Sequence, residues 1–85
     1  MHIQIKYLVT LRDVTGKRQE RVSLPPESTL RDVAAWLDER YAISLPAPQI
    51  IAMLNGTVWE LYPQKWSTEI HEDDEICLFP PVSGG

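Results

Sequence analysis

The sequence predicts a small α+β domain in which a mixed sheet of about four to five strands packs on one main helix. Three observations predict this class. Apolar and polar residues alternate in short segments near both ends of the chain, apolar residues recur at helical spacing between residues 30 and 41, and proline pairs and an Asn-Gly dipeptide separate these segments. With 85 residues, of which 44% are hydrophobic, the chain suits one domain with one modest core.

The first quarter of the chain is expected to form a hairpin. Apolar and polar side chains alternate over residues 3–7, which predicts a half-buried strand. After a short segment at 11–14, Gly16-Lys17 predicts a turn, and residues 20–24 are expected to form the second strand. Pro25-Pro26 ends that strand.

The next element is the main helix. Thr29 followed three residues later by Asp32 resembles a capping box, in which side chain and backbone satisfy each other at a helix start. Apolar residues then follow at helical spacing, which predicts a helix over residues 30–41 with one buried face, formed by Leu30, Val33, Ala34, Leu37 and Tyr41.

The second half is expected to add short strands. Residues 50–54 and 57–61 flank Asn55-Gly56, the preferred dipeptide of a type I′ turn, which predicts a second hairpin. Residues 62–69 are expected to form an ordered loop, because Pro63 interrupts any strand there. After an acidic turn, residues 75–79 predict the last strand. If the first and last strands pair in parallel, the helix crossover yields the β-grasp arrangement.

Composition excludes several classes of protein. Cys77 is the single cysteine, so the chain cannot form an internal disulfide, and its apolar neighbours favour a structural thiol over a reactive one. The net charge of −4 disfavours nucleic acid and favours docking on a basic protein cleft. The apolar stretches are far shorter than a bilayer span, and the N-terminus lacks a basic segment followed by an apolar run, so we expect no membrane contact and a cytoplasmic location.

Other candidate sites favour ordinary structural roles. His71 stands beside three acids at 72–74, but the spacing and glycine of a calcium-binding loop are absent, so a hydrated turn is favoured over a metal site. We expect no metal and no bound cofactor. Four aromatic residues could either form a partner-binding patch or pack the core and loops: Trp36, Trp59, Tyr62 and Trp66. Phe79 is the favoured partner-binding contact, because strand alternation places it opposite Leu78 at the end of the last strand.

The last six residues are the most informative part of the sequence. Pro80 and Pro81 have fixed φ angles and no amide donors, so they end the strand and favour an extended chain. After Val82 and Ser83, the pair Gly84-Gly85 carries no side chains, so a partner could approach its backbone closely. We expect residues 1–79 to form the domain and residues 80–85 a flexible tail that can thread a narrow channel. A merely frayed terminus is the alternative.

The segment Leu-Phe-Pro-Pro-Val-Ser-Gly-Gly at 78–85 resembles the C-terminus of the small, sulfur-carrier subunit of molybdopterin synthase, a family that includes the thiamin-pathway carriers. The resemblance extends to Leu11-Arg12-Asp13, the helix from Thr29 and the strand at 51–55. It implies a ubiquitin-like β-grasp fold. Two features differ from the family pattern: Asp73 replaces a turn glycine, which requires Asp to accept left-handed geometry, and the segment 59–70 is longer.

The resemblance also implies a mechanism. An ATP-dependent adenylyltransferase of the ubiquitin-activating type would form an acyl-adenylate on the Gly85 carboxylate, and a sulfur donor enzyme would convert it to a thiocarboxylate. The tail would then enter the large synthase subunit and deliver sulfur for molybdenum cofactor biosynthesis. The chain would be a non-catalytic subunit, and ATP would be used by the activating partner.

Three alternatives stay open. The chain could carry sulfur in another pathway, such as thiamin or cysteine synthesis. It could be a ubiquitin-like modifier whose Gly85 carboxylate is joined to a lysine amine, or a structural β-grasp domain with an idle tail. Activation is the same for carrier and modifier, so the tail alone does not discriminate between them.

Overall fold

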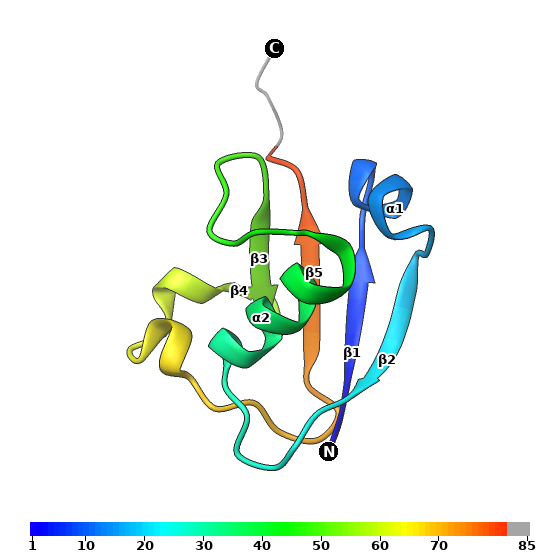
Figure 1. The fold of residues 1–85 in the computed structure, drawn as a ribbon. Coiled ribbons are helices and arrows are strands. Elements are labelled where there is room, and N and C mark those ends of the chain that lie inside the picture. Colours follow the sequence, from blue (N-terminus) through cyan, green and yellow to red (C-terminus); the bar gives the residue numbers. More distant parts are fainter. Residues whose placement is uncertain (82–85) are drawn as a thin grey trace.

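The computed structural model describes residues 1–81 and contains five strands, two α-helices and two short 3₁₀ helices (Figure 1). In chain order they are β1 (His2–Tyr7), α1 (Thr10–Thr15), β2 (Gln19–Ser23), α2 (Leu30–Tyr41), β3 (Ile51–Leu54), β4 (Thr57–Val58), η1 (Trp59–Leu61), η2 (Lys65–Ser67) and β5 (Glu75–Phe79). The predicted α+β class is therefore confirmed.

The five strands form one mixed sheet in the order β2-β1-β5-β3-β4. The first and last strands pair in parallel, with Ile5 opposite Ile76 and Tyr7 opposite Leu78. The remaining neighbours pair antiparallel. This parallel central pair, with α2 crossing one sheet face, is the β-grasp arrangement that the element order predicts (Figure 1).

The main helix has the predicted bounds, and its start is capped as predicted. The backbone N–H of Thr29 donates to the Asp32 carboxylate at 2.8 Å, which is the carboxylate half of the capping box. Its apolar face packs on the sheet and forms one core with residues of every strand but β4. The fully buried side chains of this core include Ile3, Ile5, Tyr7, Leu30, Val33, Leu37, Ile70, Ile76 and Leu78.

Two turns have the predicted geometry. Asn55 and Gly56 both have positive φ angles, 50° and 86°, as a type I′ turn requires. Asp73, which stands where the family has glycine, has a φ of 66°, so the aspartate does adopt the left-handed conformation.

The prediction of a strand over residues 57–61 is wrong beyond Val58. Strand β4 ends there, and Trp59–Leu61 forms the 3₁₀ helix η1. The reason is burial of Trp59, whose side chain is 1% exposed and packs edge to face on Trp66 with ring centroids 5.4 Å apart. A tight helical turn places the indole in the core, which a continued edge strand would not do. The expected loop at 62–69 also contains a 3₁₀ turn, η2.

The segment at 11–14, for which the sequence predicts no regular structure, lies within α1. This helix has six residues and buries only Leu11. A helix this short, with one buried residue, shows no periodic spacing of apolar residues in the sequence. Gly16 ends it with a φ of 76°, the left-handed conformation of a common helix C-cap. Within residues 1–81, neither α-helix approaches the length and apolarity needed to cross a membrane.

Candidate functional site

The predicted tail begins where the central strand of the sheet ends. Strand β5 lies between β1 and β3, and its inward side chains Ile76 and Leu78 are fully buried. The Leu78 carbonyl accepts a hydrogen bond of 3.0 Å from the N–H of Leu8. The chain is therefore held on both sides up to its last core residue. Pro80 is half-buried and Pro81 is exposed.

The reactive part of the predicted site lies outside the described residues. Val82, Ser83, Gly84 and the Gly85 carboxylate follow Pro81, and the structure describes none of them. The predicted roles of these residues stay predictions, and the geometry of the site is that of its root.

Phe79 lies on the sheet face opposite α2. Its burial alternates with that of Leu78 along β5, as the sequence predicts, and it pairs with Ile51 across the β3–β5 ladder. On the same face, Cys77 lies between Lys6 and Met53. We call the half-buried apolar residues of this face the outer strip, formed by Ile51, Met53, Val58, Cys77 and Phe79.

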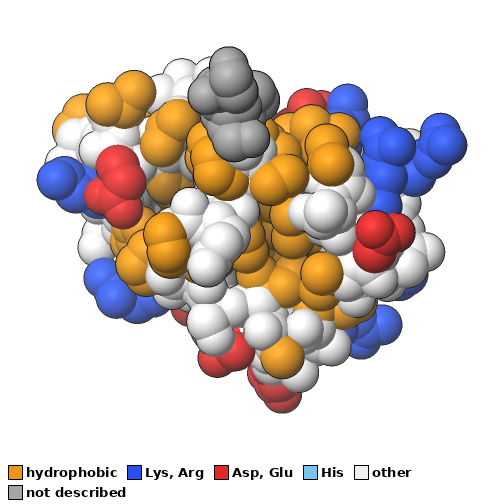
Figure 2. All heavy atoms as spheres, turned by 90° about the horizontal axis from the view of Figure 1, so that it is seen from above, with side chains coloured by type: hydrophobic (Ala, Val, Ile, Leu, Met, Phe, Trp, Pro, Cys, Tyr) orange, Lys and Arg blue, Asp and Glu red, His pale blue; other side chains and the backbone are white. Residues whose placement is uncertain are grey.

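The end of the molecule from which the chain leaves β5 is largely apolar. Figure 2 looks onto this end and shows hydrophobic side chains gathered across it, with Lys and Arg side chains and some Asp and Glu side chains around its margin on both sides. The N-terminus lies at the opposite end of the sheet (Figure 1). An apolar surface around the root of a tail is suited to contact with a partner that takes up the tail.

The cysteine of the outer strip has the environment of a structural thiol. Burial, and secondarily the negative charge of Glu75, raise the pKa of Cys77 above its ordinary value. The thiolate is the reactive form of cysteine, so this environment disfavours nucleophilic chemistry at Cys77.

The acidic turn is used to close the fold. The Asp74 carboxylate accepts the backbone N–H of His71 at 2.7 Å, and the Glu72 carboxylate accepts the backbone N–H of His2 at 2.8 Å. Arg21 lies 3.4 Å from both Glu72 and Asp73. Among residues 1–81, His, Cys, Asp and Glu side chains form no group of three with the spacing of a metal site.

Three of the four aromatic residues staple the segment after β4. The Tyr62 hydroxyl donates to the Leu54 carbonyl, and the Trp66 indole N–H donates to Glu60 at 3.0 Å. Trp59 is buried in the core. Of the two alternatives, a partner-binding patch or packing of the core and loops, these contacts favour packing for all three residues. Trp36 packs edge to face on Tyr41 with ring centroids 5.9 Å apart, and both residues are partly buried against the core.

A polar cluster that sequence reasoning missed joins α2 to the hairpin. The Glu20 carboxylate accepts hydrogen bonds of 2.6 Å from the hydroxyls of both Tyr7 and Tyr41, and Lys17 lies 3.2 Å away. Burial opposes ionisation of Glu20, but these donors outweigh it and lower its pKa. Burial and the same carboxylate raise the pKa of Tyr7, so its hydroxyl stays a donor. The sequence signal for this cluster was a tyrosine on the apolar face of two elements, Tyr7 on β1 and Tyr41 on α2.

With this geometry established, comparison with known proteins decides the family. Residues 5–85 match the ThiS family. The chain belongs to the ThiS family. Over 85 residues it is 26% identical to the molybdopterin synthase sulfur carrier subunit of Escherichia coli strain K12, and the match covers 98% of this chain and 99% of that protein.

Solved structures of similar fold come from proteins with different names. One is small archaeal modifier protein 1 of Methanosarcina acetivorans, with a TM-score of 0.77, 22% identity and coverage of 99% of this chain and 96% of that one. Another is a chain in the complex of subunits 1 and 2 of the molybdopterin-converting factor of Helicobacter pylori 26695. The match has a TM-score of 0.69 and 19% identity, and it covers 100% of this chain and 100% of that one. These structures confirm the ubiquitin-like β-grasp fold for this member of the ThiS family.

Proposed function

We propose that this protein is a sulfur carrier that delivers sulfur in molybdopterin biosynthesis from a thiocarboxylate on Gly85. The observation that carries the proposal is the sequence Pro-Pro-Val-Ser-Gly-Gly, which follows directly from the buried central strand β5. Support for the pathway comes from the full-length similarity to the E. coli sulfur carrier subunit.

The proposed chemistry has two steps, and both balance without a catalytic side chain of this protein. A carboxylate oxygen of Gly85 attacks the α-phosphorus of ATP, and pyrophosphate leaves, so an acyl-adenylate forms. Sulfur at the oxidation level of sulfide then attacks the acyl carbon, and AMP leaves with the C–O bonding pair. The product is a thiocarboxylate. Adenylation is needed because a free carboxylate is a poor electrophile. The adenylyltransferase and the sulfur donor enzyme supply the acid, base and ATP sites.

The fold suits this role in two ways. Strand β5, held between β1 and β3, gives a partner a defined surface beside the start of the predicted tail. Two glycines at the end minimise the cross-section of the chain next to the reacting carbon. The protein is then a substrate of its partners and not an enzyme in its own right.

The outer strip is the proposed contact with the large synthase subunit, with Phe79 as its main residue. Aromatic residues in an apolar surface often contribute a large share of the binding energy of an interface. The H. pylori neighbour was solved as a complex of two subunits, which supports a partner of this kind.

The test is the mass of the intact C-terminal peptide. We expect incubation with ATP, the adenylyltransferase and a sulfide source to add the mass difference between sulfur and oxygen. Gly85 deletion is the control and should abolish the change. Persistent absence of the mass change in the full chain, with an adenylyltransferase active on another carrier, would refute the proposal.

A second candidate is protein modification, because one structural neighbour is named as a modifier. The same carboxylate would then form an amide with a lysine of another protein. Conjugates that survive denaturation and disappear on Gly85 deletion would favour this candidate, whereas a free thiocarboxylate favours the carrier. If Gly85 deletion leaves every phenotype unchanged, the tail is idle and the protein is a structural domain.

A further inference from the structure

Val9 is strained and exposed at the same time. Its φ and ψ are 54° and −122°, and the N–H of Leu11 donates to the Leu8 carbonyl at 3.1 Å. This is the first central position of a type II′ turn, which favours glycine and disfavours β-branched residues. Yet the Val9 side chain is 65% exposed, so the fold gains little from its burial. A costly conformation that presents an apolar side chain to solvent points to a role outside the fold.

A second exposed apolar residue accompanies it. Val14, on α1, is 54% exposed. Val9 lies beside the end of β5, because the N–H of the preceding Leu8 donates to Leu78. Val14 belongs to α1, which packs against β5 at the same end of the molecule (Figure 1).

The length of the remaining chain restricts where a partner can bind. Four residues follow Pro81, and four extended residues reach about 14 Å at most. An enzyme that holds the Gly85 carboxylate in its active site must therefore approach within about 14 Å of Pro81. The surface formed by Val9 and Val14 lies at the same end of the molecule as Pro81, so it is available to an enzyme that approaches this closely.

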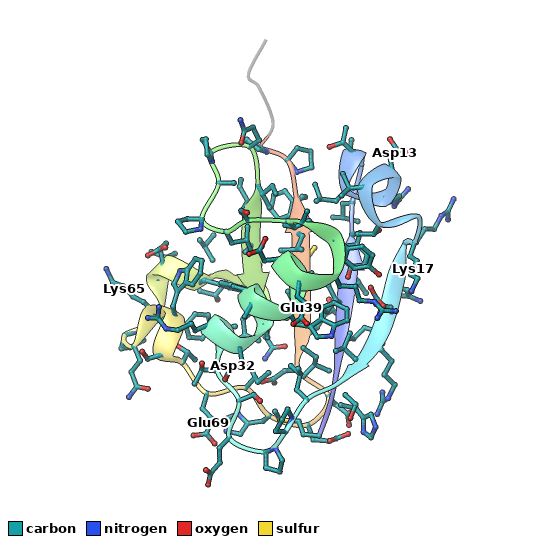
Figure 3. The ribbon with its side chains drawn as sticks, in the orientation of Figure 1. Asp13, Lys17, Asp32, Glu39, Lys65 and Glu69 are labelled. Atoms are coloured by element: carbon teal, nitrogen blue, oxygen red, sulfur yellow. The ribbon has the colours of Figure 1, made fainter. Side chains whose placement is uncertain are left out.

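The charge beside these valines is opposite in sign to that of the whole protein. Arg12, Lys17 and Arg18 line one surface hollow together with Asp13, although the net charge is −4. Figure 3 labels Asp13 and Lys17 beside α1 and β2. Lys17 pairs with Glu20, whereas Arg12 and Arg18 form no ion pair with residues 1–81. This end therefore matches an apolar surface with acidic side chains at its edge.

We propose that Val9, Val14, Arg12 and Arg18, which we call the α1 shoulder, dock the adenylyltransferase that activates Gly85. The proposal rests on the proposed function. The adenylyltransferase is the partner common to sulfur carriers and modifiers, so the inference holds whichever pathway takes the product.

The test measures the KM of the carrier in ATP–pyrophosphate exchange with the adenylyltransferase. Val9→Gly removes the side chain and relieves the turn, so we expect an unchanged or higher thermal midpoint together with a KM raised about tenfold. Val14→Ser should raise KM in the same direction, and Arg18→Glu should do so most strongly at low salt. Leu61→Ser is the matched control, because Leu61 is 74% exposed but lies at the opposite edge of the sheet.

The outcomes separate the possibilities. No exchange with the wild-type chain refutes the proposed function itself. Normal exchange with a KM unchanged in Val9→Gly and Val14→Ser overturns the shoulder alone. If the variants lose binding only to the large synthase subunit, the α1 shoulder is a contact for that subunit, and the proposal is overturned. If instead the wild type is a homodimer in sedimentation and the variants are monomers, the shoulder is a dimer contact, which also overturns the proposal. A lower thermal midpoint in Val9→Gly with unchanged KM would show a purely structural role.

Discussion

Glu20→Gln is expected to destabilise the domain by about 2 kcal/mol. The Glu20 side chain is 12% exposed and accepts two phenol hydrogen bonds of 2.6 Å, from Tyr7 on β1 and Tyr41 on α2. A hydrogen bond to a charged acceptor contributes about 1 kcal/mol more than a neutral one, and the variant weakens two of them. The ion pair with Lys17 adds little, because the lysine end of the pair is exposed.

The assay is urea unfolding at neutral pH. A loss of about 2 kcal/mol is a large part of the stability of a domain this small and corresponds to a lower melting temperature by roughly 10 °C. A double-mutant cycle with Tyr41→Phe should yield a coupling energy of about 1 kcal/mol. A Glu20→Gln loss below about 0.5 kcal/mol would refute the reasoning, because the carboxylate would then contribute no more than a neutral acceptor.

The same cluster predicts a pH dependence. Although burial favours the neutral acid, the phenol and lysine donors lower the pKa of Glu20 below its ordinary value. Glu20 therefore binds a proton more readily in the unfolded state than in the folded state. The stabilisation from the ionised carboxylate is fully present above the ordinary glutamate pKa of about 4.3, and it is lost as pH falls through the lower pKa of the folded state. The stability difference between the wild type and Glu20→Gln should therefore shrink with acidification. A difference that grows would contradict this sign.

Three further predictions follow from the site and its supports. Phe79→Ala should weaken binding to the large synthase subunit at least tenfold in calorimetry, whereas Leu61→Ala should not, and equal affinities would exclude Phe79 as a contact. Gly56→Ala should lower unfolding free energy by about 1 kcal/mol, because a φ of 86° disfavours a Cβ although nothing lies within 4 Å of it, and an unchanged value would mean that the turn relaxes. Cys77 should react with iodoacetamide at neutral pH several-fold more slowly than a free thiol, because burial raises its pKa, and fast alkylation would contradict the structural assignment.

Local patterns were sufficient wherever the governing interaction is local. The capping pair Thr29 and Asp32, the helical spacing of residues 30–41 and the Asn55-Gly56 turn each act over a few residues, and the structure confirms all three. The left-handed Asp73 was expected from the resemblance and not from a local pattern, because it stands where the family has a turn glycine. The sequence further predicts the tail and its slim end, which residue types alone define.

Tertiary packing decided the rest. Burial of Trp59 against Trp66 ended β4 early, although its residues suit a strand, because a bulky indole gains more from the core than an edge strand gains from pairing. The convergence of Tyr7, Glu20 and Tyr41 depends on three elements meeting, as does the position of Val9 beside the end of β5. Sequence by itself determined the main helix, the central strands and the residue types of the predicted tail. Only the tertiary structure decided which surfaces lie beside the end of β5, because contacts between distant segments depend on how the whole core packs.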